Sequence, residues 1–129
     1  MKILIADRLS AKLIGSLEKI SADIVSNPDL KAEELIDAIG DTNILIVRST
    51  KVLAESIERG KDLELIIRAG AGVNNIDLEK ASRNGVYVAN CPGKNSDAVA
   101  ELALGHIIAC DRRIVDASLD LRNGYWKKK

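Results

Sequence analysis

The chain has 129 residues, 47% of them hydrophobic and none of them Phe, which predicts a single domain with an aliphatic core. Its 19 basic and 19 acidic residues give a formal net charge of zero, which argues against nucleic-acid or anionic-membrane partners held by bulk electrostatics. Cys91 and Cys110 have neither zinc-type spacing nor the density of a disulfide framework, and no segment is long and apolar enough to span a bilayer. We therefore expect a cytoplasmic protein with reduced thiols.

Short apolar runs alternate along the chain with segments of helical periodicity, in which apolar residues recur at spacings of three and four. Strands are expected at residues 2–7, 22–26, 43–49, 63–70 and 86–91, and helices at 8–20, 31–40, 53–60 and 76–85. The strand runs are apolar on consecutive residues, which is typical of a sheet covered on both faces. The alternation predicts an α/β fold with a doubly wound, parallel, five-stranded sheet in flavodoxin-like order.

The remaining residues predict one long helix. Only Gly105 interrupts the segment from Ser96 to Asn123, so a helix of about 40 Å is expected, with Gly124 suited to its end. Residues 98–110 are apolar almost all round, as in a helix that is covered on every side. A five-stranded domain covers one flank only, so we expect the helix to contact a second domain or another subunit. The alternative is a helix packed back on the sheet.

Basic and polar residues follow three of the predicted strands, at residues 48–51, 68–72 and 90–96. In open parallel sheets, ligands bind beyond the carboxyl ends of the strands. Arginine suits a bidentate grip on carboxylate or phosphate, and loop N–H groups add further donors. Arg48 and Arg68 at two strand ends therefore favour a site for a small anion. In the alternative interpretation, these arginines pair with surface carboxylates and the glycines only turn the chain.

The sequence matches the motifs of other functional sites only in part. Gly70-Ala71-Gly72 resembles the start of a dinucleotide fingerprint, but Asn75 stands in place of the third glycine and neutral residues 89–91 in place of the acidic one. A receiver domain would need an aspartate where Arg48 stands. His106 lies within the apolar helix, and we interpret it as structural. We assign no catalytic residue and no metal ligand.

Three segments together resemble the amino-terminal part of D-isomer-specific 2-hydroxyacid dehydrogenases, above all the members that act on 3-phosphoglycerate. They are "ILIVRSTKV" at 44–52, the block from residue 66 to 108, and "LRNGYWKKK" at 121–129. The resemblance implies a flavodoxin-like substrate-binding domain at residues 1–95 and a crossover helix at 96–129 that leads into a nucleotide-binding domain. That further domain would hold NAD, the true fingerprint and the catalytic residues. None of these is in the chain, so the resemblance implies a truncated piece that is inactive alone.

The resemblance also assigns individual residues. Arg48 and Ser49 match the "RS" motif that contacts the anionic groups of the substrate, and Arg68 matches an arginine of the phosphoglycerate-type members. The other positions are Ala71, Gly72 and Val73, whose loop N–H groups receive the substrate carboxylate, Asn95 at the substrate edge, and Ala71 and Val99 on the cofactor side.

For the intact enzyme, the resemblance implies NAD-dependent oxidation of 3-phosphoglycerate to 3-phosphohydroxypyruvate in serine biosynthesis, or of a related 2-hydroxy acid. The intact enzyme is also expected to form a homodimer through the long helix. The alternative is a non-catalytic, flavodoxin-like ligand-binding or dimerisation module that uses the apolar helix face from Val99 to Cys110.

Overall fold

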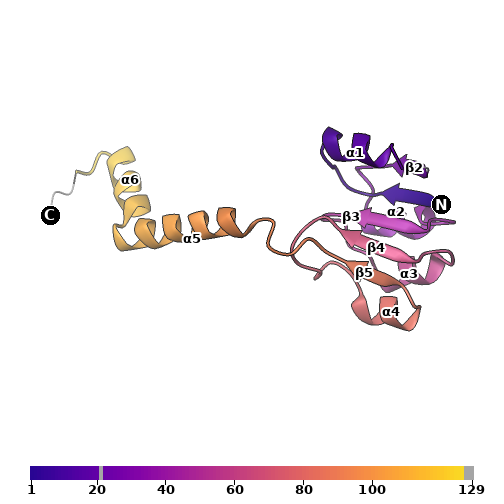
Figure 1. The fold of residues 1–129 in the computed structure, drawn as a ribbon. Coiled ribbons are helices and arrows are strands. Elements are labelled where there is room, and N and C mark those ends of the chain that lie inside the picture. Colours follow the sequence, from indigo (N-terminus) through magenta and orange to yellow (C-terminus); the bar gives the residue numbers. More distant parts are fainter. Residues whose placement is uncertain (21, 127–129) are drawn as a thin grey trace. The chain divides into compact units, whose positions relative to one another are not determined.

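The computed structural model describes residues 1–20 and 22–126, and these fall into two compact units, before and after the boundary between Pro92 and Gly93. Strands and helices alternate in the first unit (Figure 1). Its strands are β1 (Lys2–Ile5), β2 (Asp23–Ser26), β3 (Ile44–Val47), β4 (Leu65–Arg68) and β5 (Tyr87–Ala89). Its helices are α1 (Ala11–Leu17), α2 (Ala32–Ala38), α3 (Ala54–Arg59) and α4 (Leu78–Arg83).

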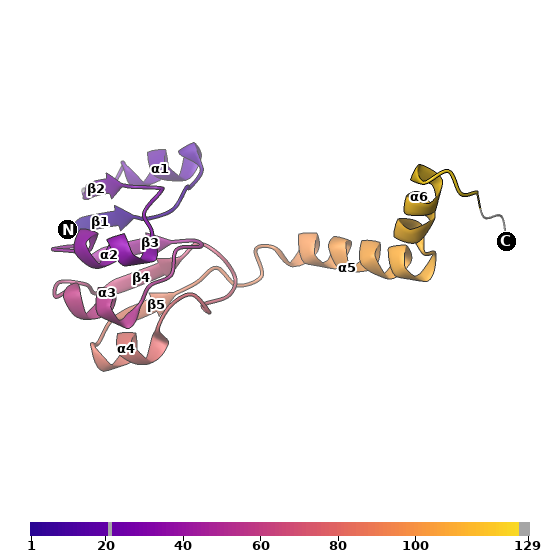
Figure 2. The same cartoon turned by 180° about the vertical axis from the view of Figure 1, so that it is seen from behind.

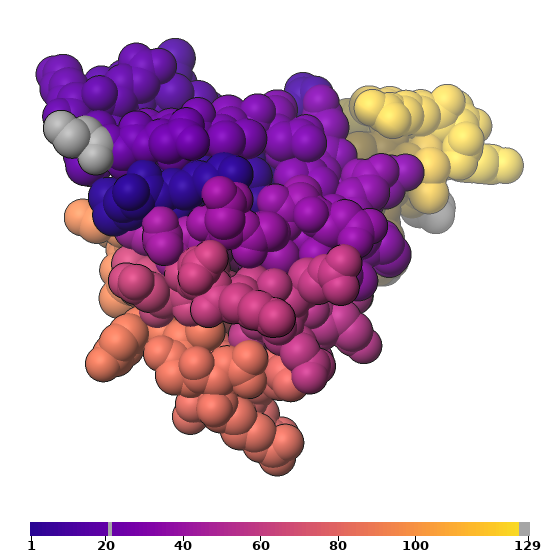
Figure 3. Space-filling view, turned by 90° about the vertical axis from the view of Figure 1, so that its right-hand side faces the viewer, coloured from indigo at the N-terminus to yellow at the C-terminus, as the bar shows by residue number. Residues whose placement is uncertain are grey.

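The five strands form one parallel sheet in the order β2-β1-β3-β4-β5. This is the flavodoxin-like order, so the predicted α/β fold is confirmed. Figure 3 shows the indigo N-terminal residues between purple segments that come later in the chain, in agreement with the position of β1 between β2 and β3. Each strand has only three or four residues, because the polar ends of the predicted runs belong to loops.

The helices cover the two faces of the sheet unequally. The larger buried cluster joins strand residues such as Leu45 and Ile66 to Leu35 of α2, Ile57 of α3 and Ala81 of α4. The smaller cluster contains Ile3, Ile5 and Ile46, and the residues packed against it include Leu9 and Leu17, which lie before and within α1. Three helices therefore lie on one face, and α1 lies on the other.

The face shared with α1 is open over β4 and β5. Leu65 is paired in register with Tyr87, so the two side chains point to the same face as Ile67. Leu65 and Ile67 are half-buried, and Tyr87 is 78% exposed. The apolar pattern predicted cover on both faces, and in the described part of the chain this prediction is wrong for this end of the sheet.

The second unit contains α5 (Ser96–Asp111) and α6 (Ile114–Arg122), not one helix through residue 123. The helical conformation is interrupted between α5 and α6 at Arg113, whose φ of 49° is in the left-handed region. Gly124, with φ of 81°, ends α6: its N–H donates to the Leu121 carbonyl and that of Tyr125 to the Asp120 carbonyl, as in a Schellman motif. Among the described residues, no helix is long and apolar enough to cross a membrane.

Candidate functional site

The loops that follow β3 and β4 lie at the end of the sheet opposite the N-terminus (Figures 1 and 2). Val47 and Arg68 are partners in the β3–β4 register, so Arg48 follows the residue that is paired with Arg68. The Arg68 Nε–H donates to the Arg48 backbone carbonyl at 3.0 Å. Among the described residues, neither arginine forms an ion pair with a carboxylate, so both guanidinium groups keep donors for a ligand.

The Arg68 side chain lies over the glycine loop. A Cβ at Gly70 would stand 2.2 Å from an Nη atom of Arg68 and 2.6 Å from its Cζ. The same Nη atom would be 3.9 Å from a Cβ at Gly72. Glycine at position 70 therefore leaves the space that the Arg68 guanidinium occupies. This is a packing role, and it differs from the role of a glycine that admits a pyrophosphate.

The loop from Ala71 to Val73 presents backbone N–H groups without acceptors. Within the described part of the chain, none of its three N–H groups donates a hydrogen bond. Its carbonyl side is fixed, because Asn90 Nδ2 donates to the Ala71 carbonyl at 2.7 Å and the Cys91 N–H donates to the Gly70 carbonyl at 2.9 Å. Unpaired N–H groups beside Arg68 form the type of surface that binds a small anion.

Asn75 explains why a third glycine is not needed here. Its side-chain Nδ2 donates to the Thr50 carbonyl at 2.8 Å, and its backbone carbonyl accepts from the Val52 N–H at 2.8 Å. The side chain thus joins the loop after β3 to the loop after β4. A glycine at this position would lack the amide that makes the first of these bonds.

Asp7 belongs to the site, and the sequence analysis missed it. This residue follows β1, which lies beside β3 in the sheet. Its Oδ2 accepts three successive backbone N–H groups, from Arg48 at 2.7 Å and from Ser49 and Thr50 at 3.0 Å each. An aspartate just beyond the strand that neighbours the "RST" loop in the predicted sheet order was the available signal.

Two opposed effects act on the pKa of the Asp7 carboxyl. Desolvation by burial raises this pKa, and the backbone hydrogen bonds from Arg48, Thr50 and Ser49 lower it. The hydrogen bonds prevail, so the pKa of Asp7 lies below its ordinary value of 3.8. The charged carboxylate therefore stabilises the loop at neutral pH.

The remaining sequence candidates lie in two places. Ser49 and Lys51 are exposed in the loop after β3. Asn95 and Val99 belong to the second unit, where Asn95 precedes the first turn of α5 without a side-chain capping bond and Val99 is 55% exposed. The structure brings together Arg48, Ser49, Arg68, Ala71, Gly72 and Val73 within the first unit.

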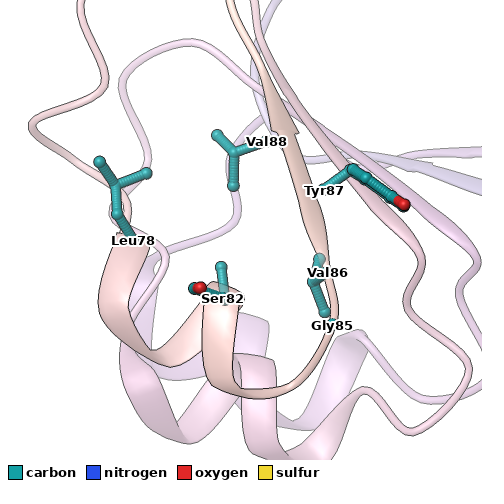
Figure 4. Close-up of a pocket in the computed structure, with 7 residues that line it drawn as sticks. Leu78, Ser82, Gly85, Val86, Tyr87 and Val88 are labelled. Atoms are coloured by element: carbon teal, nitrogen blue, oxygen red, sulfur yellow. The ribbon is translucent and has the colours of Figure 1, made fainter.

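A separate hollow lies between α4 and β5. Figure 4 shows Leu78, Ser82 and Val88 facing it, while Tyr87 points to the opposite side of the strand. Its lining consists of Leu78, Ala81, Ser82, Gly85, Val86, Tyr87 and Val88. None of these residues is charged and none was predicted to bind substrate, so this hollow is not the anion site.

Comparison with known proteins gives matches over nearly the whole chain. The sequence profile for the catalytic domain of D-isomer specific 2-hydroxyacid dehydrogenases matches residues 3–125. A hydroxypyruvate reductase from Thermotoga maritima is 42% identical over 95% of this chain and 40% of its own length. A D-3-phosphoglycerate dehydrogenase from Methanocaldococcus jannaschii is 42% identical over 100% of this chain and 25% of its own length. The chain thus spans less than half of either relative.

A solved structure also matches this chain. The NAD⁺-bound 3-phosphoglycerate dehydrogenase from Entamoeba histolytica has a TM-score of 0.74 and 35% sequence identity. The match covers 84% of this chain and 38% of that one.

Proposed function

Since the chain belongs to the family of D-isomer-specific 2-hydroxyacid dehydrogenases, we propose that it is the substrate-binding part of such an enzyme, with 3-phosphoglycerate as substrate. Membership of the family confirms the resemblance seen in the sequence. In this proposal, residues 1–95 bind substrate and residues 96–129 lead into a nucleotide-binding domain. The cytoplasmic location stays a prediction from the sequence.

One observation carries the proposal: in the described part of the chain, Arg68 lies over a loop with three unpaired backbone N–H groups, it is bonded to the backbone of Arg48, and neither arginine pairs with a carboxylate. The loop N–H groups of Ala71, Gly72 and Val73 suit the carboxylate of a 2-hydroxy acid. Arg48 and Arg68 supply charged donors for a second anionic group, as in a phosphorylated substrate. D-3-phosphoglycerate dehydrogenases among the relatives support the choice of 3-phosphoglycerate.

The glycine loop does not fit the pyrophosphate of NAD. The Arg68 guanidinium fills the space over Gly70, and the side chain of Asn75 joins two loops where a dinucleotide fingerprint has glycine. We therefore place NAD in the proposed further domain, where it would accept hydride from the substrate carbon that bears the hydroxyl group. Ala71 and Val99 would border it from this chain.

Titration of the isotope-labelled 129-residue chain with 3-phosphoglycerate, followed by NMR, tests the anion site. We expect shifts at Arg48, Arg68 and residues 71–73. Arg48→Ala or Arg68→Ala should weaken binding about tenfold or more, because a hydrogen bond to a charged group contributes about 1.5–3 kcal/mol. Arg8→Ala is the matched control, since Arg8 is exposed and already paired with Asp29 at 2.9 Å. Equal losses in all three variants, or no shifts in the wild type, would contradict the assignment.

D-Glycerate, which lacks the phosphate, separates phosphoglycerate from other 2-hydroxy acids. If the arginines bind phosphate, 3-phosphoglycerate should bind at least about tenfold more tightly than D-glycerate. Equal affinities would favour an unphosphorylated substrate, in line with the hydroxypyruvate reductase among the relatives.

A dimerisation module is the second candidate, favoured by one observation on α5. This helix has no buried residue, and its exposed side chains include Leu102, Ile107 and Ile108 at 62%, 64% and 56%. In this proposal, the chain forms a homodimer through α5. Light scattering over a dilution series measures the mass, and a stable dimer that ignores 3-phosphoglycerate would favour the module over the substrate-binding part.

A further inference from the structure

We propose that Asp7 is a positioning residue of the anion site: its carboxylate holds the loop from Arg48 to Thr50, and through this loop it orients the Arg68 guanidinium. The inference rests on the proposed function, because it concerns the same site. The Asp7 side chain binds the loop backbone and does not itself bind the substrate. It affects substrate binding through the loop and through Arg68.

Asp7 contacts the loop directly through its carboxylate. One carboxylate oxygen accepts three successive N–H groups, at 2.7, 3.0 and 3.0 Å. Successive N–H groups that converge in this way form a concave anion-binding site. Here Asp7 fills that site itself, so a substrate anion is directed to the guanidinium groups and to the unpaired N–H groups of residues 71–73.

Further hydrogen bonds connect this loop to the remainder of the site. The Arg48 N–H donates to Asp7, and the carbonyl of the same residue accepts the Arg68 Nε–H at 3.0 Å. The Thr50 carbonyl accepts Asn75 Nδ2 at 2.8 Å, and the Thr50 hydroxyl donates to the Ala6 carbonyl at 3.1 Å. Asp7 is therefore at one end of a series of hydrogen bonds that joins the carboxyl ends of β1, β3 and β4.

A repelling charge and a positioning residue at Asp7 predict opposite changes in affinity. A carboxylate near an anion site repels an anionic ligand, so removal of the Asp7 charge alone would tighten binding of 3-phosphoglycerate. Loss of a positioning residue has the opposite effect, because the loop and Arg68 must then be ordered when the ligand binds. The direction of change in affinity therefore separates the two roles.

The experiment compares Asp7→Asn and Asp7→Ala with the wild-type 129-residue chain. Asp29→Asn is the matched control, because it removes an exposed carboxylate that pairs with Arg8 and holds no loop. We expect about tenfold weaker binding of 3-phosphoglycerate for Asp7→Ala and a smaller loss for Asp7→Asn, because the amide keeps an acceptor without the charge. Asp29→Asn should bind as tightly as the wild type or slightly more tightly.

A second measurement needs no ligand. The Arg68 Nε–H is bonded to the Arg48 carbonyl in the wild type, so its NMR signal should exchange slowly with water. In Asp7→Asn we expect several-fold faster exchange, while the amide signals of Leu45 and Ile66 in the core stay in place. Affinity equal to or tighter than that of the wild type, with unchanged Nε–H exchange, would overturn the proposal.

The two proposals can fail separately. If the wild type does not bind 3-phosphoglycerate, the proposed function is overturned and the exchange measurement alone decides the role of Asp7. Faster Arg68 Nε–H exchange in Asp7→Asn then supports the positioning role, and unchanged exchange excludes it.

Discussion

Asp7 makes the stability of the first unit sensitive to acid. Backbone hydrogen bonds lower the pKa of its carboxyl below 3.8 in the folded chain, against the opposing effect of burial. The unfolded chain therefore binds the proton more tightly, and the stabilisation is fully present above about pH 4. It is lost as the pH falls through the folded-state pKa.

This linkage predicts how Asp7→Asn behaves. At pH 7 the variant should be less stable to urea than the wild type, and the difference should shrink as the pH is lowered towards 3. The pKa of Asp41 is also lowered, by the side-chain hydrogen bond from Lys2, but this contribution is common to both proteins and cancels in the comparison. Urea unfolding at several pH values, followed by circular dichroism, gives the measurement. A difference that is independent of pH would contradict it.

The residues of the site differ in how far the sequence could predict them. Arg48 and Arg68 were predicted, because an arginine at the end of a buried strand is visible in the pattern. Asp7 was missed, because its partners are backbone N–H groups that lie 41 to 43 residues further along the chain. The predicted sheet order places β1 beside β3, but it does not show which loop N–H groups the carboxylate accepts.

At the scale of elements, glycines of two kinds give opposite predictions. Gly85 ends α4 with φ of 72°, and the Val86 N–H donates to the Ala81 carbonyl, as in a Schellman motif. A Cβ at Gly85 would meet nothing within 4 Å, so the cost of alanine there is conformational. We expect Gly85→Ala to destabilise the chain by about 1 kcal/mol.

Gly15 is the matched control. It lies within α1, and a Cβ there would also meet nothing within 4 Å. Alanine is the better helix former, so Gly15→Ala should stabilise the chain by about 0.5–1 kcal/mol. The midpoints of urea unfolding should therefore move in opposite directions. Shifts of the same sign in both variants would show that these backbone conformations do not set the stability.

The break between α5 and α6 was not predicted from the sequence. Periodicity and the absence of proline favoured one helix from Ser96 to Asn123, but Arg113 takes a left-handed conformation that non-glycine residues seldom adopt. No local signal in the sequence marks this residue as a breaker. The end at Gly124 was predicted, because glycine favours a positive φ.

At the scale of the whole molecule, the sheet was predictable and its cover was not. Alternating apolar and amphipathic segments predicted five parallel strands, since each parallel pair needs a crossover, and the flavodoxin-like order was the expected topology. The pattern of Leu65 and Ile67 is that of a covered strand, yet these residues are only half-buried and Tyr87 beside them is 78% exposed. A sequence pattern shows that a face is apolar, and it does not show which segment covers that face.

The last prediction concerns catalysis by the 129-residue chain alone. The sequence contains no Gly-x-Gly-x-x-Gly, because Asn75 follows Gly70 and Gly72, and the Arg68 side chain lies over the loop. In the described part of the chain, the candidate site contains the groups proposed to bind an anion and no acid–base pair beside them. We therefore expect no NADH formation from NAD and 3-phosphoglycerate, as followed by absorbance, and no strong NAD binding by calorimetry. The labelled chain should nevertheless show shifts at Arg48 and Arg68 with 3-phosphoglycerate in the same buffer, as a control for intact substrate binding. Measurable turnover by the purified chain would place a catalytic group within these residues. It would contradict the proposal that this chain binds substrate while a further domain holds NAD and the catalytic residues.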